Sequence, residues 1–124
     1  MPNLACMKIS GFHKQMGDQI HLLTEYSGFN EFDKGYLSKV FTATRYPPEV
    51  LKMENVEYGG TGFYLDQAPE LPYEIEHAMP DYSLYADWLK GKGEEGKKSK
   101  KYKYYRDYSI GFLTRGCFRQ CPFC

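Results

Sequence analysis

The sequence lacks any long apolar run, and this absence excludes one class of protein. In 124 residues, no hydrophobic stretch approaches the roughly 20 residues that a membrane-spanning helix needs. A basic leader followed by an apolar stretch is also missing, which argues against secretion. We therefore expect a cytoplasmic protein without a membrane partner. In that compartment, clustered cysteines are more often metal ligands or catalytic groups than disulfides.

An excess of either charge is also lacking. Lysine plus arginine and aspartate plus glutamate both number 16, so the formal net charge is zero. This balance argues against a protein that binds polyanions over its whole surface, although local patches remain possible. The 42% hydrophobic and 17% aromatic content is enough for a folded core, and the length fits one domain.

Local signals predict alternating helices and strands. Asn3 is a suitable N-cap, Gly17 a suitable stop, and between them one helical stripe is predicted at Ala5, Ile9, Phe12 and Met16. Strands are predicted at residues 19–23, 36–41 and 55–58, with a short helix opened by Pro48 between the last two. Asp81 is predicted to cap a helix containing Leu84, Tyr85, Trp88 and Leu89. This alternation favours an α/β layer fold.

A glycine-rich segment, Gly59-Gly60-Thr61-Gly62, follows the predicted strand at residues 55–58. Small residues allow backbone N–H groups to approach an anion, so a phosphate-binding loop is one interpretation. The Walker lysine and the full dinucleotide-binding spacing are both absent. We therefore favour a structural turn at the end of a strand.

The composition becomes strongly basic between Lys90 and Arg106, where seven lysines and one arginine accompany two glutamates and three glycines. Tyrosines at positions 102, 104, 105 and 108 are interleaved with the basic residues, which is compatible with nucleic-acid binding. Runs of like charge with glycine rarely fold by themselves, so we favour a solvated linker and weigh against nucleic acid as a partner. Beyond the basic run, residues 108–114 have the alternation of a strand.

Three cysteines close the sequence at Cys117, Cys121 and Cys124, in the spacing C-x3-C-x2-C with Phe123 before the last. Three thiolates are too few for a closed tetrahedral zinc site. The only histidines, at positions 13, 21 and 77, lie at least 40 residues upstream. A [4Fe–4S] cube held by three thiolates keeps one iron open for a ligand. Iron–sulfur ligation is the favoured interpretation, with zinc as the alternative.

This motif resembles that of the radical S-adenosylmethionine superfamily. The resemblance implies that Cys117, Cys121 and Cys124 hold three irons of a [4Fe–4S] cluster and that the fourth iron binds S-adenosylmethionine. An electron from a flavodoxin- or ferredoxin-type donor would then cleave the cofactor to a 5′-deoxyadenosyl radical, which abstracts hydrogen from a substrate that the sequence does not identify. Phe123 matches the aromatic position whose backbone lies near the adenine.

A weaker resemblance covers the region before the motif. The N-terminal region of uncharacterised members of this superfamily is similar to the segment Pro2-Asn3-Leu4-Ala5-Cys6-Met7-Lys8-Ile9-Ser10, followed by His13-Lys14, Gly17-Asp18, Lys39-Val40-Phe41 and Gly59-Gly60-Thr61-Gly62. In those proteins the region resembles a cobalamin-binding, Rossmann-like domain. The cobalamin-ligating pattern Asp-x-His-x-x-Gly is absent here, which weighs against cobalamin.

These interpretations predict an α/β chain in three parts: a partial Rossmann-like domain at residues 1–89, a basic linker at residues 90–107, and the start of a radical S-adenosylmethionine (β/α) barrel at residues 108–124. We expect the chain to be the N-terminal portion of such an enzyme and not to turn over substrate alone. The alternative is a stand-alone α/β binding module whose terminal cysteines hold zinc or nothing.

Overall fold

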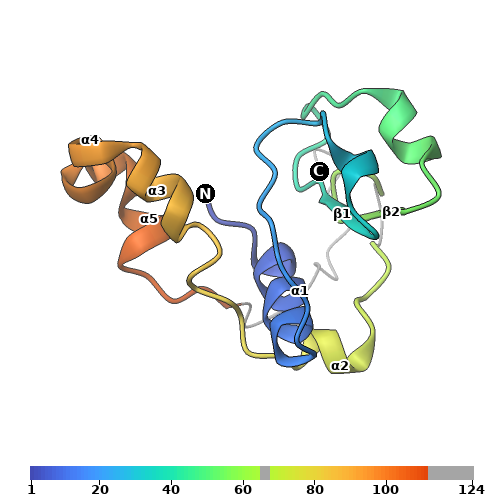
Figure 1. Ribbon diagram of the computed structural model, residues 1–124, viewed down its shortest axis with the longest axis horizontal. Helices are drawn as coiled ribbons and strands as arrows, with labels where there is room; N and C mark the ends of the chain where they lie inside the picture. The colour runs from blue at the N-terminus through green and yellow to red at the C-terminus, as the bar shows by residue number, and fades with distance from the viewer. Residues whose placement is uncertain (65–67, 112–124) are drawn as a thin grey trace, which may run out of the picture.

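The computed structural model describes residues 1–64 and 68–111, with helix α1 (Leu4–Gln15) at the centre (Figure 1). Asn3 caps α1, because its side-chain oxygen accepts a hydrogen bond of 3.1 Å from the backbone N–H of Cys6. Gly17 adopts a φ of 88° just after the helix, a conformation that favours glycine. The predicted start and stop of this helix are confirmed.

The predicted buried face of α1 is wrong in part. Met16 is 67% exposed, and the buried residues of the helix are Leu4, Met7, Ile9, Ser10 and Gly11. The segment before α3 (Ala86–Gly91) covers this face, since the N–H of Asp81 donates to the carbonyl of Met7 at 2.8 Å. A Cβ at Gly11 would lie 2.1 Å from the carbonyl oxygen of Met79, so only glycine allows this close approach.

The sheet contains two parallel strands, β1 (Gly35–Ser38) and β2 (Val56–Gly59), in the register Gly35 to Val56 through Ser38 to Gly59. The 3₁₀ helix η2 (Pro48–Lys52) lies in their connection and begins at Pro48, as predicted. Another 3₁₀ helix, η1 (Phe29–Glu31), precedes β1. The core between these elements is formed by Phe29, Val50 and Val56. The strands predicted at residues 36–41 and 55–58 are confirmed, although β1 ends three residues early.

The strand predicted at residues 19–23 is wrong, because this segment has no regular secondary structure. A strand needs a neighbouring strand to satisfy its backbone hydrogen bonds. Within the described part of the chain, β1 pairs only with β2, so residues 19–23 have no strand partner. Leu23 instead packs its side chain against the core of Phe29, Val50 and Val56. Alternating apolar residues therefore mark a half-buried loop here.

The glycine-rich segment after β2 is a turn. Gly60 has a φ of 104°, and a Cβ at this position would lie 2.4 Å from the carbonyl oxygen of Lys39. The same carbonyl accepts a hydrogen bond of 2.8 Å from the N–H of Gly62. The glycines thus bring the chain against the end of β1, which accounts for them without an anion.

Asp81 does not cap the helix that follows it. Its carboxylate accepts hydrogen bonds from the N–H and hydroxyl of Ser83, and α3 (Ala86–Gly91) begins five residues after Asp81. The aspartate therefore stabilises a turn, as short polar side chains commonly do. Before this turn lies the short helix α2 (Tyr73–Glu76), tied to α1 by an ion pair of 2.6 Å between Lys8 and Glu76.

The stretch predicted to be a linker is helical and contains the end of α3, then α4 (Gly93–Lys98), the 3₁₀ helix η3 (Lys100–Tyr102) and α5 (Lys103–Arg106). An aromatic cluster holds these helices together. The ring of Trp88 lies 5.5 Å from that of Tyr102 and 5.2 Å from that of Tyr105, and Tyr85 contacts both Trp88 and Tyr105. Burial of these large rings outweighs the charge repulsion that suggested a solvated segment.

In Figure 1, α3, α4 and α5 gather on one side of α1 and the two strands lie on the other. A parallel strand pair with helices is common to many α/β folds, so the Rossmann-like class and the three-part division remain predictions. Residues 108–111 form no strand, and the rest of the strand predicted at residues 108–114 lies outside the described residues. No helix in residues 1–64 or 68–111 is long and apolar enough to cross a membrane.

Candidate functional site

The residues that the sequence singles out as a metal site, Cys117, Cys121 and Cys124, lie outside the described part of the chain, as does Phe123. Cys6 is the one cysteine that the structure describes. Within residues 1–64 and 68–111, no group of three or more histidine, cysteine, aspartate or glutamate side chains is placed to hold a metal ion. The described site is therefore of another kind.

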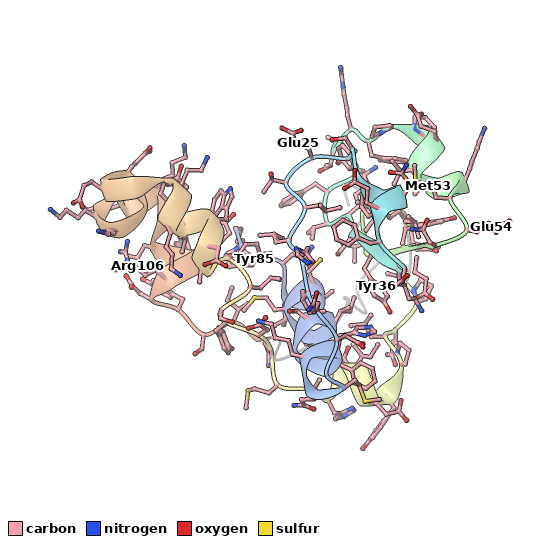
Figure 2. The ribbon with its side chains drawn as sticks, viewed as in Figure 1. Glu25, Tyr36, Met53, Glu54, Tyr85 and Arg106 are labelled. Carbon is pink, nitrogen blue, oxygen red and sulfur yellow. The ribbon has the colours of Figure 1, made fainter. Side chains whose placement is uncertain are left out.

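An open groove of about 1040 Å³ lies between α1, the segment at residues 17–26 and strand β1. Its lining combines apolar side chains from residues 20–23 with polar side chains from α1 and β1. Tyr36, labelled on β1 in Figure 2, is among them. The groove exists because residues 19–23 do not pair with β1 and leave space beside it.

Three polar side chains meet in this groove. The Nδ1 atom of His13 lies 2.7 Å from a carboxylate oxygen of Asp18, and its Nε2 atom lies 2.9 Å from the hydroxyl of Tyr36. His13 comes from the last turn of α1, Asp18 follows the turn at Gly17, and Tyr36 belongs to β1. A helix end, a turn and a strand thus converge on one imidazole, whose side chain is 20% exposed.

The arrangement allows the proton to be held in two ways. A neutral imidazole that donates from Nδ1 to Asp18 accepts the Tyr36 hydroxyl proton at Nε2, whereas an imidazolium donates to both oxygens. The three groups therefore form a hydrogen-bonded path from the groove to the solvent-exposed Asp18.

Cys6 lies on α1 at the other end of the groove lining. Burial raises the pKa of the Cys6 thiol to about 11, against a smaller lowering by hydrogen bonds with Ser38. The hydroxyl of Ser38 also accepts a hydrogen bond of 2.9 Å from the side chain of Asn3. A thiol in this environment stays protonated at neutral pH, so Cys6 is poorly suited to nucleophilic attack or metal ligation.

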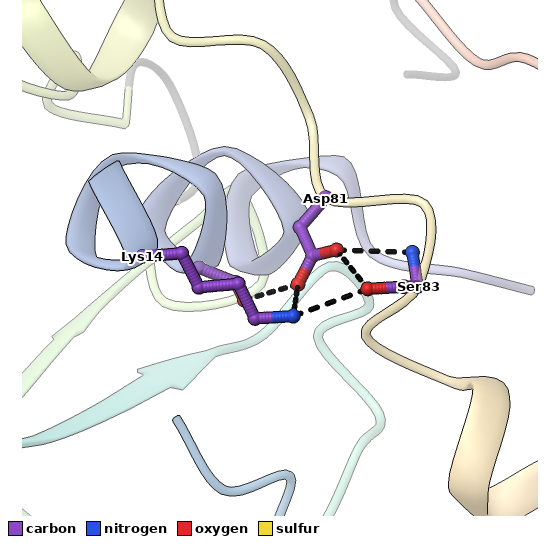
Figure 3. A network of polar contacts seen from close by, with 4 residues as sticks. Lys14, Asp81 and Ser83 are labelled. Carbon is purple, nitrogen blue, oxygen red and sulfur yellow. Dashed lines mark hydrogen bonds and ion pairs between the residues drawn. The ribbon is translucent and has the colours of Figure 1, made fainter. Parts of the chain in front are cut away.

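A second polar network joins α1 to the turn before α3 (Figure 3). One carboxylate oxygen of Asp81 contacts the Lys14 ammonium at 2.7 Å and the Ser10 hydroxyl at 2.6 Å. Burial by itself would raise the pKa of Asp81, but the hydrogen bonds from Lys14, Ser10 and Ser83 lower it to about 2. These contacts satisfy a carboxylate that is only 8% exposed, which is typical of a structural link.

The sequence analysis considered the three histidines only as possible zinc ligands and did not predict the convergence at His13. The proximity of His13 and Asp18 around a helix-ending glycine was a usable local signal. Tyr36 could not be found that way, because it reaches His13 only through the packing of β1 against α1. The other two histidines make ring contacts, His77 with Tyr73 and His21 with Phe32.

The chain matches no family model, no curated protein and no solved structure.

Proposed function

We propose that the chain is part of a radical S-adenosylmethionine enzyme and that Cys117, Cys121 and Cys124 hold its [4Fe–4S] cluster. The observation that carries this proposal is the spacing C-x3-C-x2-C, with Phe123 directly before the last cysteine. The donor set fits the group, since three thiolates match three irons and leave the fourth for the amino and carboxylate groups of S-adenosylmethionine.

Two features of the described residues favour an open iron over a closed four-ligand zinc site. Cys6, the fourth cysteine of the chain, has a raised pKa and so does not present a thiolate at neutral pH. Both ring nitrogens of His13 are already within hydrogen-bond distance of Asp18 and Tyr36. Recruiting either residue as a fourth ligand would break contacts that hold α1 and its surroundings together.

When bound, the two cofactors supply one-electron cleavage of a sulfonium bond and hydrogen abstraction from a substrate. The three cysteines would hold the metal, and Phe123 would take the aromatic position near the adenine. A reduced protein of the flavodoxin or ferredoxin type supplies the electron.

The test is anaerobic reconstitution of the full chain with iron and sulfide, followed by iron analysis and electron paramagnetic resonance of the reduced protein. We expect a cubane signal that changes when S-adenosylmethionine is added, because the cofactor binds the open iron. Serine variants of Cys117, Cys121 or Cys124 should lose the cluster.

Cys6→Ala is the matched control and should retain the cluster. Stoichiometric zinc without an iron–sulfur signal would contradict the proposal and support the stand-alone binding module instead. Loss of the cluster in Cys6→Ala, with the fold intact by circular dichroism, would also contradict it, since Cys6 would then be a ligand.

A further inference from the structure

The helices α3–α5 divide their tyrosines into an inner and an outer set. Tyr102 and Tyr105 pack on Trp88 inside the aromatic cluster. Tyr104 and Tyr108 lie outside it and are 50% and 43% exposed. Their ring centroids are 5.0 Å apart, with an angle of 37° between the planes. The structural role of the inner set does not account for the outer pair.

The same helices carry a local excess of positive charge. Residues 97–106 include six lysines and arginines and no aspartate or glutamate. Lys97 and Lys98 are paired with Glu94, and Arg106 is paired with Asp107. In contrast, Lys100 and Lys101 have no carboxylate within ion-pair distance among the residues that the structure describes. Their charge is therefore available to an anionic partner.

The unpaired charge and the outer tyrosines lie in one short segment, residues 100–108. Tyr104 belongs to α5 and Tyr108 follows shortly after its end, while Lys100 and Lys101 lie in η3 directly before α5. The Lys103 ammonium lies over the Tyr108 ring, 5.3 Å from its centroid. Because the rings of Tyr104 and Tyr108 are in contact, a planar group stacked on Tyr104 would have a cation close by.

We propose that Lys100, Lys101, Lys103, Tyr104 and Tyr108 form a docking surface for single-stranded nucleic acid. Bases stack on the two exposed tyrosines, and phosphates contact the neighbouring lysines. This combination of aromatic faces with an adjacent cationic track is how sequence-tolerant single-strand binding works. The inference is independent of the proposed iron–sulfur function, because it uses none of the cysteines.

Composition favoured a solvated linker here. The helices in the structure instead favour a binding surface. A flexible linker would present its lysines and tyrosines in no fixed relation, whereas here contacts fix Tyr104 against Tyr108 and Lys103 over the Tyr108 ring. An anionic membrane is a poorer fit, since the surface lacks the aliphatic side chains that an interfacial helix inserts into the bilayer. The helices here are also only three to six residues long.

The test measures binding of the full chain to a fluorescein-labelled oligothymidylate of about twelve nucleotides by fluorescence anisotropy. We expect Tyr104→Ala to weaken binding about fivefold or more, as expected for the loss of one stacked base. In Lys100→Ala, the slope of log affinity against log salt should fall by about 0.7, the value for one lost phosphate contact on a single strand.

Matched controls make the same chemical changes elsewhere on the chain. Tyr73→Ala removes a tyrosine that is 73% exposed on α2, and Lys90→Ala removes a lysine already paired with Asp87. Neither should change affinity or salt slope. No binding at low salt, equal losses in variants and controls, or binding of the full chain to phosphatidylserine vesicles in preference to the oligonucleotide would each overturn the proposal.

Discussion

Asp81 is the residue whose charge matters most for the described fold. Its carboxylate receives hydrogen bonds from Lys14, Ser10 and Ser83 and holds the turn before α3 against α1. These bonds lower the pKa of Asp81 from 3.8 to about 2 despite its burial. A folded-state pKa below the unfolded one stabilises the protein above pH 3.8 and loses that effect as the pH falls towards 2. The shift corresponds to roughly 2 kcal/mol.

We therefore expect Asp81→Asn to lower the free energy of unfolding by about 1–3 kcal/mol near neutral pH, as for other hydrogen bonds to a buried charge. The difference from wild type should shrink between about pH 4 and pH 2, because the wild-type carboxylate is protonated there. Urea unfolding at several pH values measures this. Asp87→Asn is the control, since its carboxylate is 94% exposed and paired with the exposed Lys90. An equal effect in both variants would contradict the structural role of Asp81.

Cys6 offers a second prediction for a single residue. Its thiol has a pKa of about 11 instead of 9.0, so the thiolate fraction at neutral pH is about a hundredfold smaller than in the unfolded chain. In a variant with serine at positions 117, 121 and 124, we expect iodoacetamide to modify Cys6 slowly in the folded state and rapidly in urea. The folded-state rate should keep rising to above pH 10. A rate that levels off just above pH 9.0, the ordinary pKa of a thiol, would show an unburied thiol.

At the scale of elements, the features that the sequence predicted correctly depend on local contacts, and those that it did not predict depend on distant ones. The start and end of α1 were predictable because Asn3 and Gly17 act through their own backbone neighbours. The strand predicted at residues 19–23 failed because a strand exists only through a partner, and periodicity does not reveal one. The site at His13 was missed for the same reason, since Tyr36 approaches it from a separate strand.

The basic segment shows the opposite error, in which composition hid an ordered element. Lysine and glycine dominate residues 90–107 and favoured a solvated linker, while the tyrosines among them were compatible with nucleic-acid binding. Tyr102 is only 6% exposed in the structure, because it packs against Trp88 from α3. Pairing between aromatic rings some fourteen residues apart is a tertiary contact, and neither charge counts nor turn propensities record it.

The packing of α3 against α4 yields a prediction about two glycines. A Cβ at Gly96 would lie 2.3 Å from the carbonyl oxygen of Leu89, whereas a Cβ at Gly91 would meet nothing within 4 Å. Alanine in a helix is favoured over glycine by up to about 1 kcal/mol, so Gly91→Ala should stabilise these helices slightly. Gly96→Ala should destabilise them by about 1–3 kcal/mol, because backbone must move to admit the methyl group.

Trp88 is the only tryptophan of the chain, so its fluorescence reports on this unit directly. Urea unfolding followed at Trp88 should give midpoints in the order Gly91→Ala, wild type, Gly96→Ala, from highest to lowest. If both variants shift the midpoint in the same direction, α3 and α4 do not approach each other as closely as the structure indicates.

At the scale of the whole molecule, α3–α5 and the strands are connected mainly through α1 and the residues around it (Figure 1). On the helical side, hydroxyl groups make several of the links between the described residues. The hydroxyl of Tyr85 accepts a hydrogen bond of 2.9 Å from the N–H of Asn3, and the hydroxyl of Tyr105 accepts one from the N-terminal ammonium. Asp81 and Ser83 add the contacts to α1 described above. Among residues 1–64 and 68–111, the links between the two parts are therefore mainly polar, and the core of Phe29, Val50 and Val56 does not extend to α3–α5.

Limited apolar contact between two parts favours unfolding in separate steps. We expect the urea transition seen by Trp88 fluorescence to occur at lower denaturant than the transition seen by far-ultraviolet circular dichroism, which also reports on α1. Tyr85→Phe removes the hydroxyl that bonds Asn3 while keeping the ring in the aromatic cluster. This variant should lower the urea midpoint seen by Trp88 fluorescence and leave the midpoint of the later transition unchanged. Coincident transitions that shift together in Tyr85→Phe would show instead that α1 couples the two parts into one cooperative unit.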